Sequence, residues 1–220
     1  MTKILFGCDD AGKGPVLGPM VVAGVIVLEE DMHKLKELGV KDSKLLTGKD
    51  RERLYSLILG LVKNYRIIII TPQEIDNAVL SDKTNLNWLE GEKMAELINF
   101  LKPDHAIIDC PSTNKKAFDA YIKTKLVVKT ELQCEHKGER FIEVAAASIL
   151  AKVTRDREVQ KIQSKIKERI GSGYPSDPLT KEFLKNNWDK YHEIFRHSWA
   201  TYKVYSEGKN SKKQKKLGEY

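Results

Sequence analysis

The chain has 220 residues, the length of one domain or of one domain with a small appendage. Its 41% hydrophobic and 31% charged residues exclude both an intrinsically disordered chain and a membrane protein. The 38 Lys and Arg residues exceed the 31 Asp and Glu residues, which gives a formal net charge of +7. The first residues lack the apolar stretch of a signal peptide, and the three cysteines include no C-x-x-C pair. We therefore expect a cytoplasmic protein without a zinc site.

Apolar runs and helical periodicities alternate along the chain, so the sequence predicts an α/β domain. In chain order, we expect strands over residues 3–8, 20–28, 64–70, 106–109 and 126–129, and helices over 49–62, 85–101, 115–123, 142–170 and 177–185. Glycines at positions 171 and 173 end the longest helix. We expect a main domain over residues 1–170 and a mainly helical extension with a basic tail over 171–220.

The basic tail permits two interpretations. Residues 203–220 contain six lysines and two glutamates, so they account for +4 of the net charge. Such a tail is either a solvated, disordered end or a basic arm with a salt-sensitive attraction to phosphates. The net charge alone does not decide between them.

Acidic residues stand at the ends of two predicted strands. Asp9 and Asp10 follow the first strand, and Asp109 ends the fourth, where the ligands of open α/β sheets gather. Adjacent residues of a regular strand face opposite ways, so both aspartates reach one site only if the strand stops at Asp9. Carboxylates without clustered histidine or cysteine suit a hard ion, Mg²⁺ or Mn²⁺. The alternative is that Asp10 only begins a turn and Asp109 only caps the following segment.

Gly12, Lys13 and Gly14 come directly after the first two acids. Their glycines allow a ligand to approach the backbone closely, and their N–H groups can donate to a phosphate or a hydroxyl. A G-x-G sequence by itself is weak evidence, and the neighbouring carboxylates strengthen it.

Several segments together resemble ribonuclease HII. Residues 7–19, which read G-C-D-D-A-G-K-G-P-V-L-G-P, are similar to the family's D-E-A-G-R-G-P…G-P opening. Residues 41–44 resemble its K-D-S-K segment, and residues 136–139 and 145–156 resemble its H-K-A-D and A-A-S-I-L-A-K-V-T-R-D stretches. Residues 171–178 and 196–199 match later segments in the form typical of archaeal members. The matches cover nearly the whole chain.

The resemblance implies a ribonuclease H-like catalytic domain, a mixed five-stranded sheet flanked by helices, over residues 1–170. It also implies four catalytic carboxylates that bind Mg²⁺ or Mn²⁺, and these fall on Asp9, Asp10, Asp109 and Glu139. The family usually has Glu at the second position and Asp at the fourth, so each swap moves an oxygen by about 1.3–1.5 Å. We expect a metal preference or rate that departs from the family norm, with Mn²⁺ preferred. Asp156 is the rival fourth acid, although a structural pair with a neighbouring arginine suits it better.

The resemblance further implies endonucleolytic cleavage of RNA in RNA–DNA hybrids and at single ribonucleotides in duplex DNA, leaving 3′-hydroxyl and 5′-phosphate ends. The 2′-hydroxyl distinguishes RNA from DNA. Its expected readers are the backbone of Gly12, Lys13 and Gly14 together with Tyr174, which is otherwise a turn residue packed beside Pro175. Lys44 and Lys152 are the expected phosphate contacts. We expect a monomer whose partners are these nucleic acids and no membrane, and the sequence does not indicate whether a clamp protein binds.

Two other functions compete with this one. A phosphotransferase of the actin–sugar kinase fold has a D-x-G-x-G phosphate hairpin like that of residues 10–14, but such a protein needs a second nucleotide-binding half. A nucleic-acid-binding protein without catalysis would use the basic tail alone. Nucleotide binding tests the first alternative, and cleavage of a ribonucleotide-containing duplex tests the second.

Overall fold

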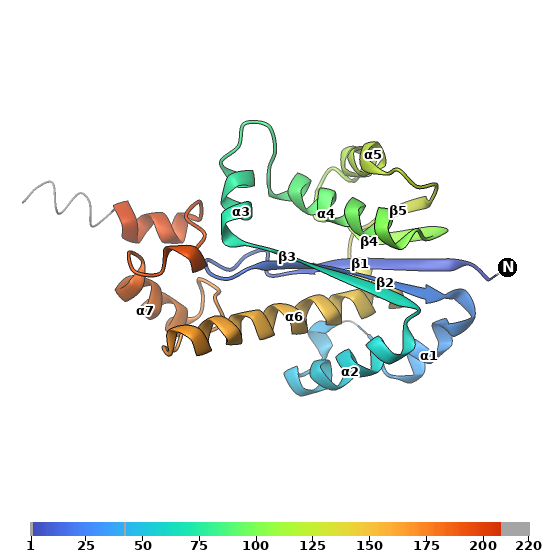
Figure 1. Cartoon of the computed structure of the whole chain (residues 1–220), viewed down its shortest axis with the longest axis horizontal. Helices are drawn as coiled ribbons and strands as arrows, with labels where there is room; N and C mark the ends of the chain where they lie inside the picture. The colour runs from blue at the N-terminus through green and yellow to red at the C-terminus, as the bar shows by residue number, and fades with distance from the viewer. Residues whose placement is uncertain (1, 42, 208–220) are drawn as a thin grey trace, which may run out of the picture.

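A mixed five-stranded sheet forms the centre of the computed structural model, which describes residues 2–41 and 43–207 (Figure 1). Its strand order is β3-β2-β1-β4-β5. The antiparallel strands are β1 (Ile4–Ala11), β2 (Met20–Leu28) and β3 (Asn64–Ile70). The last two, β4 (His105–Asp109) and β5 (Glu131–Glu135), run parallel to β1. The expected α/β fold with a mixed five-stranded sheet is confirmed.

Helices cover both faces of the sheet (Figure 1). One face carries α1 (Met32–Glu37), α2 (Gly48–Leu61) and the long α6 (Ile142–Ile166). The other carries α3 (Pro72–Val79), α4 (Leu86–Leu101) and α5 (Lys115–Lys125). Short 3-10 helices span Glu29–Asp31, Ser43–Leu45, Gly138–Arg140 and His192–Ile194. No helix in residues 2–41 or 43–207 combines the length and the apolar character that crossing a bilayer requires.

Helix α6 lies unusually close to β1. A Cβ atom at Gly7 would stand 2.1 Å from the carbonyl carbon of Glu143, so only glycine fits there. The facing turn of α6 is a run of fully buried alanines, Ala145, Ala146 and Ala147. Small residues on both elements therefore bring the helix against the strand that carries the first two acids.

The C-terminal residues pack against the segment that follows β1. Helix α7 (Pro178–Asn187) and the helical residues 200–207 share an apolar cluster with Val16 and Leu17. In Figure 1 this part lies at the end of the molecule that α6 reaches with its last turns. The division at residue 170 stays a prediction, and the lysines at positions 209–216 lie outside the described residues.

Several expected boundaries are wrong for identifiable reasons. The strand expected over residues 126–129 is absent, because Leu126 caps α5 and Val127 is 86% exposed. The fifth strand lies over Glu131–Glu135 instead. The long helix ends at Ile166 and not at residue 170, since Lys167 takes a left-handed conformation with φ of 56°. Helices α1 and α3 were not expected, although the Thr71–Glu74 capping box and Pro72 mark the start of α3.

Candidate active site

One cavity of about 470 Å³ brings all ten predicted site residues together. It lies at the end of β1, between the sheet, the start of the segment after β1 and the middle of α6. The four predicted catalytic acids and the six predicted substrate contacts line it: Asp9, Asp10, Asp109, Glu139, Gly12, Lys13, Gly14, Lys44, Lys152 and Tyr174. Residues up to 165 positions apart in the chain, from Asp9 to Tyr174, thus share one space.

The first two acids reach this cavity from opposite faces of β1. The strand does not stop at Asp9, as we expected for a shared site, but continues through Asp10 to Ala11, paired with β2. Asp9 lies on the α6 face, where Ser148 hydrogen-bonds to it. Asp10 lies on the α4 face, next to Glu90. Both carboxylates line the cavity, which lies at the last residues of the strand.

The third and fourth acids are held by the parallel pairing of β4 with β5. That register places Asp109 opposite Glu135, so the 3-10 turn after β5 returns beside Asp109. The Gly138 N–H donates to Asp109 Oδ1 at 2.6 Å. A Cβ atom at Gly138 would lie 3.0 Å from Asp109 Cα, so glycine permits this approach. Glu139 Oε1 accepts a hydrogen bond from Lys44 Nζ at 2.7 Å.

Three of the four acids have raised pKa values, chiefly because they are buried. Burial, and next the charge of Asp10, raise the pKa of Asp9 to about 8. Burial and the charge of Glu90 raise the pKa of Asp10, and burial raises that of Asp109 against the opposing donation from Gly138. Partial burial also raises the pKa of Glu139, but the contact with Lys44 outweighs it and the net direction is down. The centre of the cavity is therefore a site where a cation relieves repulsion.

These residues fit a hard divalent ion by donor chemistry, since oxygen is their common donor and their carboxylates repel one another. The side chains are not gathered around one point, however. Within the described part of the chain, no three His, Cys, Asp or Glu side chains are close enough together to hold an ion. In this arrangement Asp109 accepts from the Gly138 N–H and Glu139 accepts from Lys44.

The predicted basic contacts are engaged with protein groups. Lys13 Nζ donates to Asn87 Oδ1 and to Glu90 Oε2, both at 2.8 Å, so its ammonium points toward α4. Lys152 Nζ donates to the hydroxyls of Ser43 and Ser148, the latter at 2.8 Å. The side chain of Lys13 is therefore occupied by contacts with α4.

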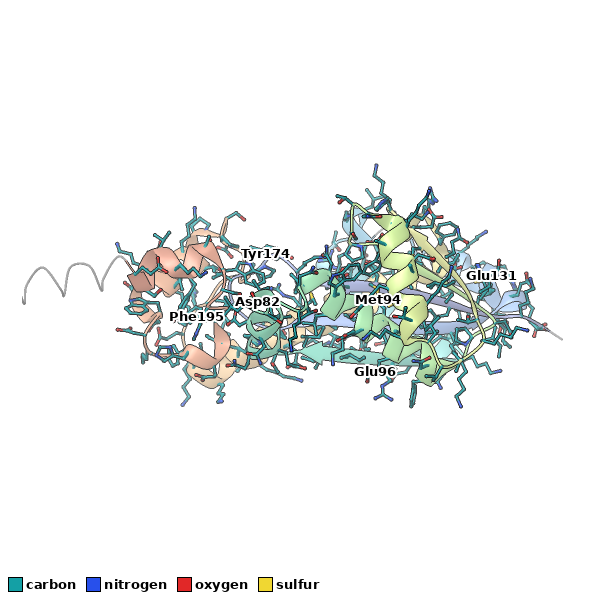
Figure 2. All side chains as sticks on the ribbon, turned by 90° about the horizontal axis from the view of Figure 1, so that it is seen from above. Asp82, Met94, Glu96, Glu131, Tyr174 and Phe195 are labelled. Atoms are coloured by element: carbon teal, nitrogen blue, oxygen red, sulfur yellow. The ribbon has the colours of Figure 1, made fainter. Side chains whose placement is uncertain are left out.

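Tyr174 lines the cavity and belongs to the C-terminal segment (labelled in Figure 2). Its ring is the nearest group to a Cβ built on Gly14, at 3.6 Å, and the Arg155 guanidinium lies 5.2 Å from the ring centroid. The residue is 40% exposed. Asp156 forms the expected pair with Arg155, at 3.3 Å.

Sequence reasoning missed one buried charge beside the cavity, Glu90, and it named Arg155 only as a partner of Asp156. Glu90 has a fully buried side chain on α4, and Arg155 is 5% exposed on α6. The amphipathic patterns of these helices predict only their apolar faces. The A-K-V-T-R-D match contains Arg155, which was the available signal for it.

Comparisons with known proteins agree along the length of the chain. The family model described as Ribonuclease HII matches residues 6–202. The chain belongs to the ribonuclease HII family. The "Ribonuclease HII" of Thermococcus onnurineus is 45% identical over 221 residues, covering 98% of this chain and 95% of that protein.

Solved structures of the family support the same assignment. Ribonuclease H2 from Pyrococcus horikoshii OT3 superimposes with a TM-score of 0.84 at 39% identity, covering 93% of this chain and 98% of that one. Ribonuclease HII from Archaeoglobus fulgidus, solved in a complex with PCNA, has a TM-score of 0.79 at 36% identity and covers 89% of this chain and 95% of that one. As a member of ribonuclease HII, the chain is a hydrolase of the ribonuclease H type, which excludes the phosphotransferase alternative.

Proposed function

We propose that this protein is a metal-dependent endonuclease that cuts the RNA strand of RNA–DNA hybrids and cuts duplex DNA on the 5′ side of a single embedded ribonucleotide. The observation that carries the proposal is the shared cavity, where four carboxylates stand beside the backbone of residues 12–14 and beside Tyr174. Membership in ribonuclease HII supports the substrate class.

The reaction is phosphodiester hydrolysis. A water oxygen bonds to phosphorus, the bond from phosphorus to the 3′ oxygen breaks, and that oxygen takes up a proton. The products are a 3′-hydroxyl and a 5′-phosphate. Asp9 and Asp109 would hold Mg²⁺ or Mn²⁺, with Asp10 and Glu139 completing the ligand set. The chemistry that these residues would gain from a bound divalent ion is activation of the water and stabilisation of the departing oxygen.

The chain's own residues select and orient the scissile bond. The Lys13 and Gly14 N–H groups, which have no protein acceptor among the described residues, would donate to the ribose 2′-hydroxyl. Tyr174 packs over Gly14 and would bound the space for the sugar. Lys44 and Lys152 line the same cavity and would approach the flanking phosphates once substrate competes for their present partners.

Cleavage of a DNA duplex with one ribonucleotide tests this function. We expect one cut, 5′ to the ribonucleotide, with Mg²⁺ or Mn²⁺ and none with excess chelator. Asp9→Asn should lower the rate by on the order of 10⁴-fold while leaving the fold intact. Asp156→Asn, which removes a charge at the same cavity from a residue outside the proposed ligand set, is the matched control and should retain activity. An Asp9→Asn variant that turns over normally would refute the assignment.

A sliding clamp is a candidate partner, because the Archaeoglobus fulgidus relative was solved with PCNA. The sequence itself gave no indication of such a contact. Co-elution of the full chain with an archaeal clamp on gel filtration tests it, and separate elution of the two proteins at micromolar concentration would argue against it. The same experiment reports whether the chain alone elutes as the expected monomer.

A further inference from the structure

A fully buried arginine fixes the backbone that lines the cavity. The Arg196 side chain has no solvent exposure and donates only to main-chain carbonyls. Its Nη1 donates to the Lys13 oxygen at 2.9 Å, its Nη2 to the Gly12 oxygen at 2.6 Å, and its Nε to the Gly18 oxygen at 3.1 Å. Within residues 2–41 and 43–207 it forms no salt bridge.

Burying a charge without a counter-ion is expensive, and apolar side chains would fill such a space at lower cost. Burial and the charge of Arg155 lower the pKa of Arg196, although it keeps its proton at neutral pH. A role in holding the Gly12–Gly18 segment explains why a charge occupies this position.

The geometry of the peptide bond determines which way the N–H groups of this segment point. In a planar trans peptide, the C=O of one residue and the N–H of the next point in opposite directions. Because the Gly12 and Lys13 carbonyls face Arg196, the N–H groups of Lys13 and Gly14 face away from it. Residues 12–14 line the cavity, and within the described chain neither N–H has a protein acceptor.

Arg196 is itself anchored from two sides. Its backbone N–H donates to the Val16 oxygen at 2.9 Å. The next two residues, His197 and Ser198, donate their N–H groups to the buried carboxylate of Asp76 on α3, at 2.7 and 2.9 Å. The backbone at Arg196 is therefore held in place. Its guanidinium group in turn holds the segment after β1.

We propose that Arg196 is a positioning residue for ribonucleotide recognition: it holds the Lys13 and Gly14 N–H groups toward the 2′-hydroxyl while contacting neither substrate nor ion. This inference rests on the proposed function. It predicts that loss of Arg196 impairs the choice of ribose over deoxyribose and leaves general duplex binding intact.

Steady-state kinetics on the single-ribonucleotide duplex, with an all-DNA duplex as competitive inhibitor, test the proposal. We expect Arg196→Ala to lower kcat/KM by about 10²-fold, the size of effect that a displaced reacting group produces. The inhibition constant of the all-DNA duplex should stay within about twofold of wild type. Guanidinium ion at millimolar concentration should restore part of kcat/KM, because it can re-enter the vacated space. Arg169→Ala removes an exposed arginine from the same part of the chain and is the matched control.

Equal losses in kcat/KM and in all-DNA affinity, or no rescue by guanidinium, would overturn the proposal. If thermal melting shows that Arg196→Ala does not fold, Arg196→Lys replaces it, because lysine keeps the charge and loses the several N–H donors of the guanidinium. Its kcat/KM and the inhibition constant of the all-DNA duplex are then compared with those of wild type. Failure of the wild-type chain to cut the duplex refutes the proposed function. Wild-type cleavage combined with unchanged discrimination in the variants refutes only the role of Arg196.

Discussion

Lys13 Nζ lies 2.8 Å from Glu90 Oε2, and this ion pair joins the segment after β1 to a fully buried carboxylate on α4. The other oxygen of Glu90, Oε1, has no hydrogen-bond partner among the described residues. Lys13 is therefore the cation that makes a buried acid tolerable beside Asp10, and this contact gives it a structural task in addition to its backbone role.

Removing the positive charge at residue 13 should destabilise the protein more than replacing lysine with arginine. Lys13→Met leaves Glu90 buried without its cation, and we expect a loss of about 2–4 kcal/mol in the free energy of unfolding. Lys13→Arg keeps the charge and should lose less than about 1 kcal/mol. Urea denaturation of the metal-free protein measures both values. Equal stability of the two variants would show that Glu90 does not depend on residue 13.

The stability of the metal-free protein should fall as the pH rises. Asp9 has a pKa of about 8 in the folded chain against 3.8 as the ordinary value, so the folded state holds the proton more tightly. The favourable contribution is complete below about pH 4 and is lost progressively as the pH rises to about 8, on the order of several kcal/mol. Thermal melts between pH 5 and pH 9 measure this slope.

Asp9→Asn should flatten that slope, because asparagine carries no charge at any of these pH values. Mg²⁺ or Mn²⁺ should raise the melting temperature of the wild-type chain most at high pH and should have little effect on Asp9→Asn. A slope that is unchanged in Asp9→Asn would place the titrating group elsewhere.

Asp10 and Glu139 stand where the family usually has Glu and Asp. This exchange should change how the activity depends on the metal ion. Because Asp10 is one methylene shorter than the usual glutamate, we expect higher activity with Mn²⁺ than with Mg²⁺, which tolerates less geometric error. Asp10→Glu should raise the ratio of Mg²⁺ to Mn²⁺ activity severalfold. A metal titration of kcat for both chains measures the ratio, and equal or higher wild-type activity in Mg²⁺ would contradict the expectation.

Tyr174→Phe should lower kcat/KM on a single-ribonucleotide duplex by about tenfold, the effect of one lost hydrogen bond. Tyr65→Phe is a matched control, since Tyr65 is 40% exposed like Tyr174 but lies on β3 and does not line the cavity. An equal effect of the two substitutions would show that the hydroxyl of Tyr174 is not used.

Strands and helices with strong apolar patterns were predictable, and contacts between distant segments were not. The run of Val and Ile between Met20 and Leu28 allowed the full extent of β2 to be predicted, because both faces of this strand are buried and apolar. The β-branched pair Val127 and Val128 misled the prediction of the fifth strand. That strand, Glu131–Glu135, is an edge strand with polar residues, and its position is set by pairing with β4.

The candidate site was predictable to the level of residue type and position, through the resemblance to a known family. Its internal contacts were not. Asp9 and Asp10 were expected on a strand that ends early, whereas they occupy opposite faces of a continuing one. The partners of Lys13 and the donors of Arg196 depend on how α4 and the C-terminal segment pack, and a local sequence pattern carries no such information.

The narrow space at Gly138 restricts which residue can stand at that position. Residues 136–139 read H-K-G-E where the ribonuclease HII pattern reads H-K-A-D. With the backbone in its present place, the methyl group of alanine would stand 3.0–3.1 Å from the Cα, Cβ and Oδ1 atoms of Asp109. An alanine at position 138 would therefore require Asp109 or the backbone of the turn to shift by a few tenths of an ångström.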